Sequence, residues 1–362
     1  MDYLLHQFAP FSFSLMIVIV LIPVWITICK KWHLFDEPDD RKHHHPMTPS
    51  MGGIAIFAGL FISFLSFAVI DDADRLRYLF GASLILFFTG FFDDMMNVPA
   101  RNKLMLQTAS AIIVFAGGYR IETLNGILGI YEIPLFIQAP LTVMLIVAFT
   151  NAFNFIDGID GLAASLGLVF TITMGLLFIE YGKYDYAMLC FCMCGALSGF
   201  LMYNIHPAKI FMGDTGSLII GFVSAVLFIE LFDAGVAEKT IAAGNPARVM
   251  AIAFIPLFDI TRTLVIRYLN GKSPFQPDRN HLHHLILKFG FGHTSSTFLI
   301  VFAALVVIIL QRLVPAINPL LFIFAASAVS LLIMNSHTLR LLVKIRSTIQ
   351  PAWGERQQRI IS

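Results

Sequence analysis

Charged residues are scarce in this sequence. Of its 362 residues, 24 are Lys or Arg and 23 are Asp or Glu, a share of 13%, whereas soluble globular domains usually carry about 25%. The hydrophobic share is 57% and includes 35 phenylalanines. So few charges cannot cover a surface that faces water. The composition therefore excludes a soluble globular protein and predicts a chain whose solvent is lipid.

An excess of basic charge and a framework of cysteines are also missing. The net charge is +1, so nucleic acid is not an expected partner. Three of the four cysteines, Cys190, Cys192 and Cys194, lie two apart in one apolar run. On a helix such neighbours point away from one another, so we expect small buried residues and no shared metal ion. No basic segment precedes the first apolar run, so no cleavable signal peptide is predicted.

The apolar runs predict an all-α integral membrane protein with about eleven transmembrane helices, since most of them approach the ~20 residues that cross a bilayer. No polar stretch is long enough to fold alone, so residues 1–362 are expected to form a single polytopic membrane domain. The expected spans are 11–29, 52–70, 78–92, 104–118, 139–153, 161–179, 186–203, 215–232, 248–266, 297–314 and 319–335.

The positions of Lys and Arg predict the orientation of the chain. The loops at about 29–51, 93–103, 152–160, 204–214 and 267–296, together with the tail 336–362, hold 16 of these residues, and the opposite loops hold 6. Because cytoplasmic loops carry the excess of Lys and Arg, the N-terminus is predicted outside and the C-terminus in the cytoplasm. Ten of the eleven histidines also lie in or beside the predicted cytoplasmic segments.

Two adjacent carboxylates, Asp93 and Asp94, follow the aromatic end of the third span. Neighbouring carboxylates repel one another unless a cation or a proton lies between them, and Mg²⁺ takes one or two carboxylates together with phosphate oxygens. A solvated helix end is the plainer alternative, but a helix C-terminus already carries partial negative charge. The pair therefore favours a magnesium site.

Further acids stand in two other cytoplasmic segments. In NAFNFIDGIDGLAAS, residues 151–165, Asn154, Asp157 and Asp160 recur every three residues, which predicts one side of a helical turn. FMGDTGS, residues 211–217, places Asp214 at the entrance of the eighth span, where a single Asp could simply cap the helix. With the other acids on the same side of the membrane, metal ligation is the favoured interpretation.

Basic and imidazole side chains accompany these acids. The alternatives are a basic patch that attracts anionic lipid and a zinc site. Consecutive histidines are weak lipid anchors at neutral pH, and no cysteine lies near the histidines of SPFQPDRNHLHHLILKFGF, residues 273–291. Imidazole and guanidinium groups therefore favour phosphate binding, and the candidates are Lys42, His44, Lys209, Arg279, His281, His283 and His284.

Carboxylates that hold Mg²⁺, or Mn²⁺ in its place, and that are surrounded by cations suit a diphosphate. A site at the membrane boundary implies one substrate from water and one from lipid, as in phosphoryl-type transfer from a nucleotide diphosphate to a lipid phosphate. An ion-coupled secondary transporter is the alternative from another class. Its acids would lie near the bilayer midplane, where the sequence offers Asp259 with Arg262 three residues on.

Four segments carry a resemblance to a known family, namely DD…ARNK at 93–103, NAFNFIDGIDGLA at 151–163, FMGDTGS at 211–217 and PDRNHLHH at 277–284. In this order they resemble the motifs of the polyprenyl-phosphate N-acetylhexosamine-1-phosphate transferases, over about residues 34–293. The last segment is similar to the branch that transfers N-acetylglucosamine-1-phosphate to undecaprenyl phosphate. The resemblance implies a multi-pass enzyme of the bacterial cytoplasmic (inner) membrane, active at the cytoplasmic face, which initiates a cell-envelope polysaccharide.

The resemblance also implies a reaction, in which a UDP-N-acetylhexosamine and undecaprenyl phosphate give undecaprenyl-diphosphate-sugar and UMP. The first acids would position or deprotonate the polyprenyl phosphate, and the acids after the fifth span would line the nucleotide pocket. The implied catalytic residues are Asp93, Asp94 and Asp157, the implied metal ligands are Asp214 and Asn154, and the implied substrate-binding residues are Asp160 and the seven cationic candidates named above.

The donor sugar and two further points stay open at this stage. UDP-N-acetylglucosamine is the expected donor, with UDP-MurNAc-pentapeptide or another UDP-amino sugar as alternatives. Among the histidines at 43–45, His44 is chosen as the acting one, although the family usually has a single His there. A second copy of the chain, in a homodimer, is a further candidate partner.

Overall fold

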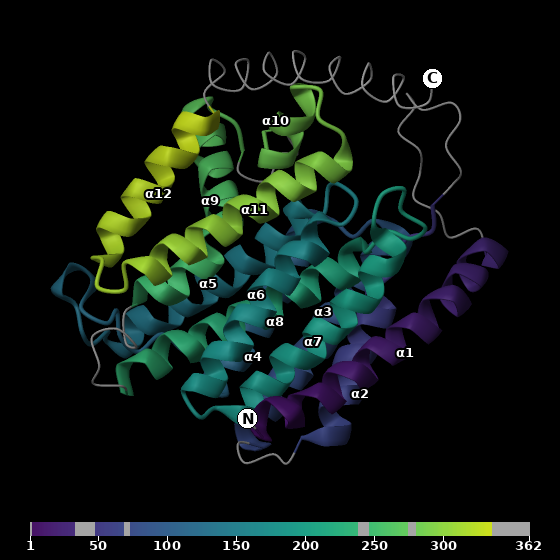
Figure 1. The fold of residues 1–362 in the computed structure, drawn as a ribbon, viewed down its shortest axis with the longest axis horizontal. Helices are drawn as coiled ribbons and strands as arrows, with labels where there is room; N and C mark the ends of the chain where they lie inside the picture. Colours follow the sequence, from purple (N-terminus) through teal and green to yellow (C-terminus); the bar gives the residue numbers. More distant parts are fainter. Residues whose placement is uncertain (1, 33–47, 69–72, 238–245, 274–279, 335–362) are drawn as a thin grey trace, which may run out of the picture.

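The computed structural model describes residues 2–32, 48–68, 73–237, 246–273 and 280–334. These residues form helices joined by loops (Figure 1). The helices are α1 (Asp2–Trp32), α2 (Gly53–Phe67), α3 (Ala73–Met96), α4 (Ala100–Ala116), α5 (Leu135–Ile156), α6 (Leu162–Glu180), α7 (Tyr184–Asn204), α8 (Gly213–Ala237), α9 (Pro246–Leu269), α10 (Leu282–Lys288), α11 (His293–Leu313) and α12 (Pro319–Met334), with a short 3₁₀ turn at Ile127–Gly129.

Each of the eleven predicted spans falls on one of these helices, and the short helix α10 has no predicted counterpart. Within the described ranges, eight helices are long and apolar enough to cross a membrane, and α2 and the first part of α12 are shorter apolar helices. The all-α prediction is therefore confirmed, and the helices have the character of a multi-pass membrane protein.

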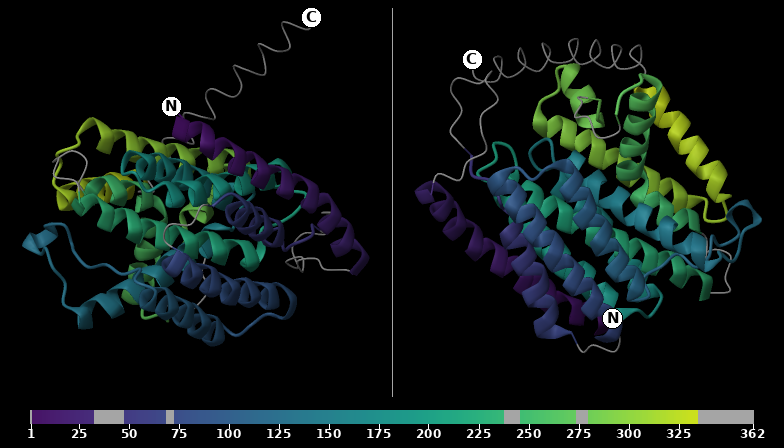
Figure 2. Two further views of the ribbon diagram at one scale, coloured as in Figure 1. Left: turned by 90° about the horizontal axis from the view of Figure 1, so that it is seen from below. Right: turned by 180° about the vertical axis from the view of Figure 1, so that it is seen from behind.

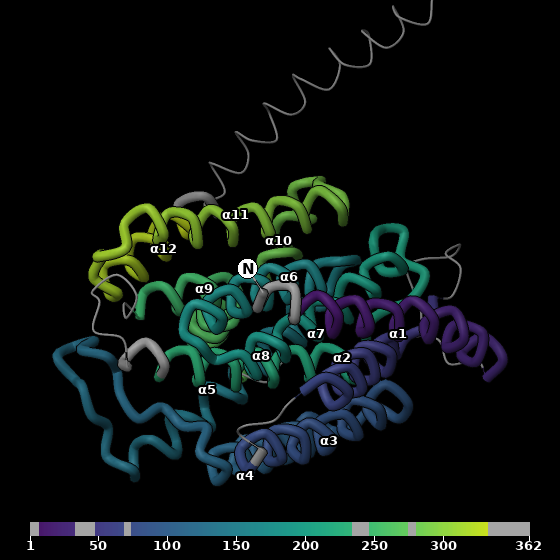
Figure 3. The backbone as a smooth tube through the Cα atoms, turned by 60° about the horizontal axis from the view of Figure 1, so that its bottom comes forward, coloured from purple at the N-terminus to yellow at the C-terminus, as the bar shows by residue number. Residues whose placement is uncertain are grey.

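Helix α8 lies at the centre of the bundle (Figure 3). Its apolar window within Gly213–Asp233 is buried completely, as expected of a helix that is hydrophobic all round. It packs against α2, α3, α5 and α6, while α1 lies on one side of the bundle and α11 and α12 lie on the other (Figures 1 and 2). A side chain at the first turn of α8 therefore lies where the ends of several helices meet.

Close backbone contacts fix the start of α8 against α2. The N–H groups of Gly52 and Gly53 donate to the carbonyls of Phe211 and Met212, both at 2.9 Å. A Cβ atom on Gly53 would lie 2.0 Å from the backbone nitrogen of Gly216, so no larger residue fits at this crossing.

A buried glutamate lies toward the other end of α8. Glu230 is 3% exposed and contacts the ammonium of Lys183, and one of its oxygens lies 2.9 Å from the Arg75 guanidinium. Arg75 also lies over the ring of Tyr119, 4.5 Å from its centre. Paired cations of this kind are what a buried carboxylate requires.

The burial predicted for the cysteines is confirmed. Cys190, Cys192 and Cys194 are buried within α7, Cys29 is buried within α1, and all four are free thiols. They act as small apolar residues in the packing.

Candidate functional site

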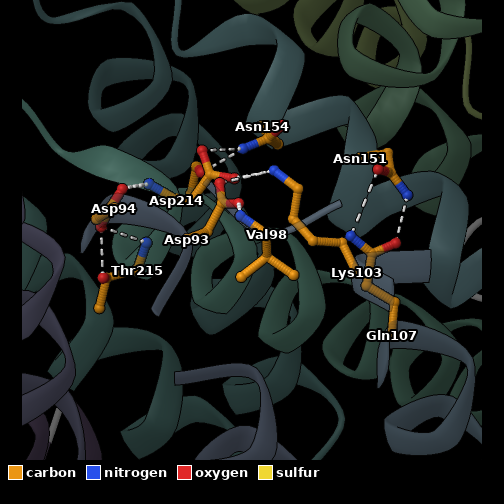
Figure 4. Close-up of polar contacts among 10 residues, drawn as sticks. Asp93, Asp94, Val98, Lys103, Gln107, Asn151, Asn154, Asp214 and Thr215 are labelled. Atoms are coloured by element: carbon orange, nitrogen blue, oxygen red, sulfur yellow. Dashed lines mark hydrogen bonds and ion pairs between the residues drawn. The ribbon is translucent and has the colours of Figure 1, made fainter. Parts of the chain in front are cut away.

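Asp94 holds the first turn of α8. Its Oδ1 accepts the backbone N–H of Asp214 at 2.7 Å, and its Oδ2 accepts both the N–H of Thr215, at 3.0 Å, and the Thr215 hydroxyl (Figure 4). Gly213 has a φ of +73°, and a Cβ there would lie 2.6 Å from Asp94 Oδ2. Asp94 therefore caps α8 from another helix and fixes the backbone that carries Asp214.

Lys103 joins the two other acids of this site. Its Nζ lies 2.7 Å from Asp93 Oδ2 and 2.6 Å from Asp214 Oδ2 (Figure 4). The second oxygen of Asp93 accepts the N–H of Val98 at 2.7 Å. One ammonium faces two carboxyl groups, and Asp94 lies beside them. Converging carboxylate oxygens are the donor set that suits Mg²⁺.

Asn154, near the end of α5, supports Asp214 from a third side. Its Nδ2 donates to Asp214 Oδ1 at 2.9 Å and contacts the Ser217 hydroxyl at 3.0 Å. One turn earlier on α5, Asn151 donates to Gln107 Oε1 on α4 at 2.7 Å, which ties α5 to the helix that carries Lys103 (Figure 4). The fold thus brings together Asp93, Asp94, Asn154 and Asp214 from three helices.

A pocket of about 390 Å³ opens beside these acids. The acids on its wall come from three segments that are far apart in the sequence, and polar atoms make up most of its surface. Its lining residues are Ser50, Asp93, Asp94, Asn97, Asp157, Gly158, Ile159, Asp160, Asn204, Phe211, Gly213, Asp214 and His293.

The predicted helical face through Asn154, Asp157 and Asp160 is wrong. Helix α5 ends at Ile156, and residues 157–161 form turns, with Gly161 at a φ of +75°. Asp157 and Asp160 still reach the pocket, because the turn rather than a helix directs them there.

Asp160 contacts two histidines that the sequence did not single out. Its Oδ2 lies 2.6 Å from His206 Nδ1 and 3.6 Å from His293 Nδ1, and it accepts the N–H of Ala208 at 3.3 Å. Burial alone raises the pKa of Asp160, but the interactions with His293, His206 and Ala208 outweigh it and lower this pKa to about 2. Asp160 is therefore ionised at neutral pH.

The intramembrane acid of the sequence, Asp259, faces the histidine segment. Its Oδ2 lies 2.9 Å from His281 Nδ1, and its Oδ1 accepts the N–H of Leu282 at 2.8 Å. Both side chains of the pair are nearly buried, at 3% and 5% exposure. Arg262 donates to the carbonyl of Asn280 at 2.7 Å. Asp259 thus anchors the start of α10 and fixes the ring of His281.

His283 is the most buried of the three histidines in this segment. It packs against Gly158, where a Cβ would lie 2.2 Å from His283 Nε2. Burial, followed by the charges of His284, His281 and His293, lowers the pKa of His283 to about 3, so its ring is neutral at physiological pH. His284 follows on α10 and is partly exposed. The spacing of three residues between His281 and His284 would place them on one face of a helix, but His281 precedes the helix in extended backbone.

The remaining predicted residues lie away from the pocket or outside the described part of the chain. Lys209 is exposed and does not line the pocket. Lys42, His44 and Arg279 lie outside the described residues.

Several residues of the site were missed by the sequence interpretation. Lys103 stands in the ARNK segment, and its nearness to Asp93 in the sequence was the available signal. His206 and His293 are isolated histidines in separate predicted cytoplasmic loops, and only the fold brings them to Asp160. Asp259 was weighed as a sign of a transporter.

Comparisons with known proteins identify the family of the chain. The sequence pattern of glycosyl transferase family 4 matches residues 76–232, a range that includes the acids around Lys103 and the turn that carries Asp160.

Related proteins match over most of their length. A Bacillus subtilis (strain 168) protein named "Probable undecaprenyl-phosphate N-acetylglucosaminyl 1-phosphate transferase" is 32% identical over 80% of this chain and 80% of its own. The undecaprenyl-phosphate alpha-N-acetylglucosaminyl 1-phosphate transferase of Yersinia pestis is 32% identical over 81% of this chain and 79% of its own. The protein of the same name from Escherichia coli (strain K12) is 33% identical, over 76% and 75%. The chain therefore belongs to glycosyl transferase family 4.

Proposed function

We propose that this protein transfers N-acetylhexosamine-1-phosphate, foremost N-acetylglucosamine-1-phosphate, from a UDP-sugar to undecaprenyl phosphate. The products are undecaprenyl-diphosphate-sugar and UMP. The observation that carries the proposal is the acid-lined pocket of about 390 Å³ at the ends of α3, α5 and α8, in a chain whose relatives bear the names of such transferases. In this reaction an oxygen of the lipid phosphate attacks the β-phosphorus of the donor, and the bond from that phosphorus to UMP breaks.

Asp93 and Asp214 are the proposed centre of the reaction. Their oxygens converge on the Lys103 ammonium, so the point between them already suits a cation. Mg²⁺, or Mn²⁺ in its place, would be held there by Asp214 as the central ligand, and would offset the charge of the transferred phosphate. Asn154 faces Asp214 with its amide nitrogen, so it acts by holding that carboxylate in position.

The chain's own side chains supply the remaining parts of the chemistry. Asp93 is the proposed group that orients the lipid phosphate or accepts its proton. Asp94 acts through the backbone of Asp214 and Thr215, which it holds. Asp157 and Asp160 also line the pocket and are the proposed contacts of the nucleotide.

The histidine segment is the proposed contact for phosphate or sugar. Asp259 fixes His281 through Nδ1, which leaves Nε2 as the nitrogen for a ligand. Lys42, His44, Lys209, His284 and Arg279 remain candidates for the same task.

The proposed setting is the bacterial cytoplasmic membrane, with about eleven spans, the N-terminus outside and the site on the cytoplasmic face. The 16-to-6 bias of Lys and Arg supports this orientation. The site joins the ends of α3, α5 and α8, so a soluble nucleotide sugar and a membrane lipid can reach it together. A homodimer of this chain remains a prediction from the sequence.

The experiment that tests the proposal measures UMP release by the purified chain in lipid vesicles. We expect release only when UDP-N-acetylglucosamine, undecaprenyl phosphate and Mg²⁺ are present together, and each omission is a control. A panel with UDP-MurNAc-pentapeptide and other UDP-amino sugars identifies the donor by mass spectrometry of the lipid product. Solute uptake without any lipid-linked product would support a transporter instead.

A further inference from the structure

Three side chains of the types that ligate metals meet beside the pocket. We propose that Asp160, His206 and His293 form a binding site for a transition-metal ion of the zinc class, separate from the acids around Lys103. Each residue offers one ligand atom, and these atoms lie within 4.8 Å of one another. The three residues come from different segments, which are the turn after α5, the loop after α7 and the first turn of α11.

One separation matches a shared ion, and a second would have to widen. Asp160 Oδ2 lies 3.6 Å from His293 Nδ1, and ligands of one tetrahedral zinc ion, bonded at about 2.0–2.2 Å, lie roughly 3.4 Å apart. Asp160 Oδ2 also lies 2.6 Å from His206 Nδ1, a hydrogen bond that would have to open by about 0.8 Å for both atoms to reach one ion. The centres of the two imidazole rings are 5.1 Å apart. His293 Nδ1 is buried and has no hydrogen-bond partner among the described residues, so this nitrogen points into the cluster with its bonding capacity unused.

The three segments are held together before any ion binds. The Thr297 hydroxyl, one turn after His293, donates to the backbone carbonyl of Asp160 at 3.0 Å. The Gly161 N–H donates to Asn204 Oδ1 at 2.9 Å, which ties the same turn to the end of α7. A site fixed in this way loses little conformational freedom when it binds an ion.

The chemistry of the three groups selects the kind of ion. Two imidazoles with one carboxylate suit Zn²⁺, Co²⁺ or Ni²⁺, whereas Mg²⁺ prefers oxygen ligands. The His206 side chain is 48% exposed and His293 is 32% exposed, so an ion can enter from water. Asp160 and His293 also line the 390 Å³ pocket, and a fourth position of the ion would face it. If the proposed function holds, UMP in the pocket and the ion compete for Asp160.

The test is zinc binding to the full chain in detergent, measured by calorimetry with Mg²⁺ in large excess. His43, His44 and His45 are first replaced by Asn in all samples, because consecutive imidazoles can bind zinc themselves. We expect one Zn²⁺ per chain in this background. Adding His206→Asn or His293→Asn should weaken zinc binding by at least about 10–100-fold, because a loss of this size is typical even when a residue that only supports a metal ligand is replaced. His284→Asn is the matched control and should keep the affinity.

A ligand exchange identifies the metal contact directly. His206→Cys should restore binding, and with Co²⁺ in place of Zn²⁺ it should add a thiolate-to-cobalt absorption band that the parent lacks. The four native cysteines are buried and serve as an internal blank. No stoichiometric zinc binding, or equal affinities in parent and His206→Asn, would overturn the proposal and leave His206 and His293 as simple hydrogen-bond partners of Asp160. None of these readouts depends on transferase activity.

Discussion

Lys103 offers the sharpest perturbation of the acid cluster. Replacing it by Met keeps most of the unbranched side chain and removes the ammonium that lies 2.7 Å from Asp93 Oδ2 and 2.6 Å from Asp214 Oδ2. The carboxylates of Asp93 and Asp214 then lose the cation between them. We expect Lys103→Met to lower turnover strongly, because the carboxylates repel one another and leave their working positions.

The size of this effect follows from the contacts that are lost. A hydrogen bond to a charged group contributes about 1.5–3 kcal/mol, and Lys103 makes two. The three side chains are 12% to 23% exposed, so water can replace part of the hydrogen bonding that Lys103 provides. An estimate of about 2–4 kcal/mol in the barrier corresponds to a fall in kcat/KM of roughly 30- to 1000-fold.

The assay is UMP release as a function of Mg²⁺ concentration. Lys103 lies against the two oxygens that are proposed to face the metal, so Lys103→Met should change the Mg²⁺ concentration at half-saturation as well as lower kcat. Lys103→Arg should retain part of the activity, and Lys272→Met, at an exposed position, is the control. Turnover within about threefold of the parent, with the unfolding temperature unchanged, would refute the proposed role of Lys103.

Four further substitutions test other parts of the site. Asp94→Asn places an amide against the N–H of Thr215 and leaves a buried donor unpaired, at a cost of about 1–3 kcal/mol. The unfolding temperature and the rate of UMP release should both fall. Values equal to those of the parent would contradict the capping role of Asp94. Asp259→Asn should lower turnover about 10-fold or more. Adding His281→Ala should lower turnover little further, because both residues act through one contact. Additive losses of turnover in the double variant would contradict this. His283 binds a proton at pH 6.5 when unfolded but only at about 3 when folded, so its stability contribution is complete above pH 6.5 and is lost toward pH 3, by up to about 1.4 kcal/mol per pH unit. His283→Asn should therefore flatten the fall in unfolding temperature between pH 7 and 5, and an unchanged slope would contradict the lowered pKa.

The helical fold and the meeting of the acids could be predicted from local sequence. Long apolar runs indicate helices on their own, and each of the eleven expected spans overlaps a helix. Asp93, Asp94, Asn154 and Asp214 stand at span ends on the same predicted side of the membrane, and the fold does bring them together.

The partners within the site could not be predicted, because they depend on contacts between distant segments. Asp94 caps a helix that begins about 120 residues later, and an adjacent pair of acids gives no sign of which one acts as a cap. Spacing alone also suggested a helix through Asp160, but Gly161 at φ +75° shows a turn there. Asp259 reads as an isolated intramembrane acid until α10 places His281 against it.

The transfer of a sugar together with its phosphate is the central claim, and one labelling measurement tests it most directly. UDP-N-acetylglucosamine would carry one label on the β-phosphorus and a different label on the sugar, and would be incubated with the purified chain, undecaprenyl phosphate and Mg²⁺. We predict that both labels enter the lipid product in equal amounts and that unlabelled UMP is released. Sugar label in the lipid without the β-phosphorus, together with released UDP, would contradict the proposed reaction, as would the absence of both labels from the lipid with every UDP-amino sugar tried.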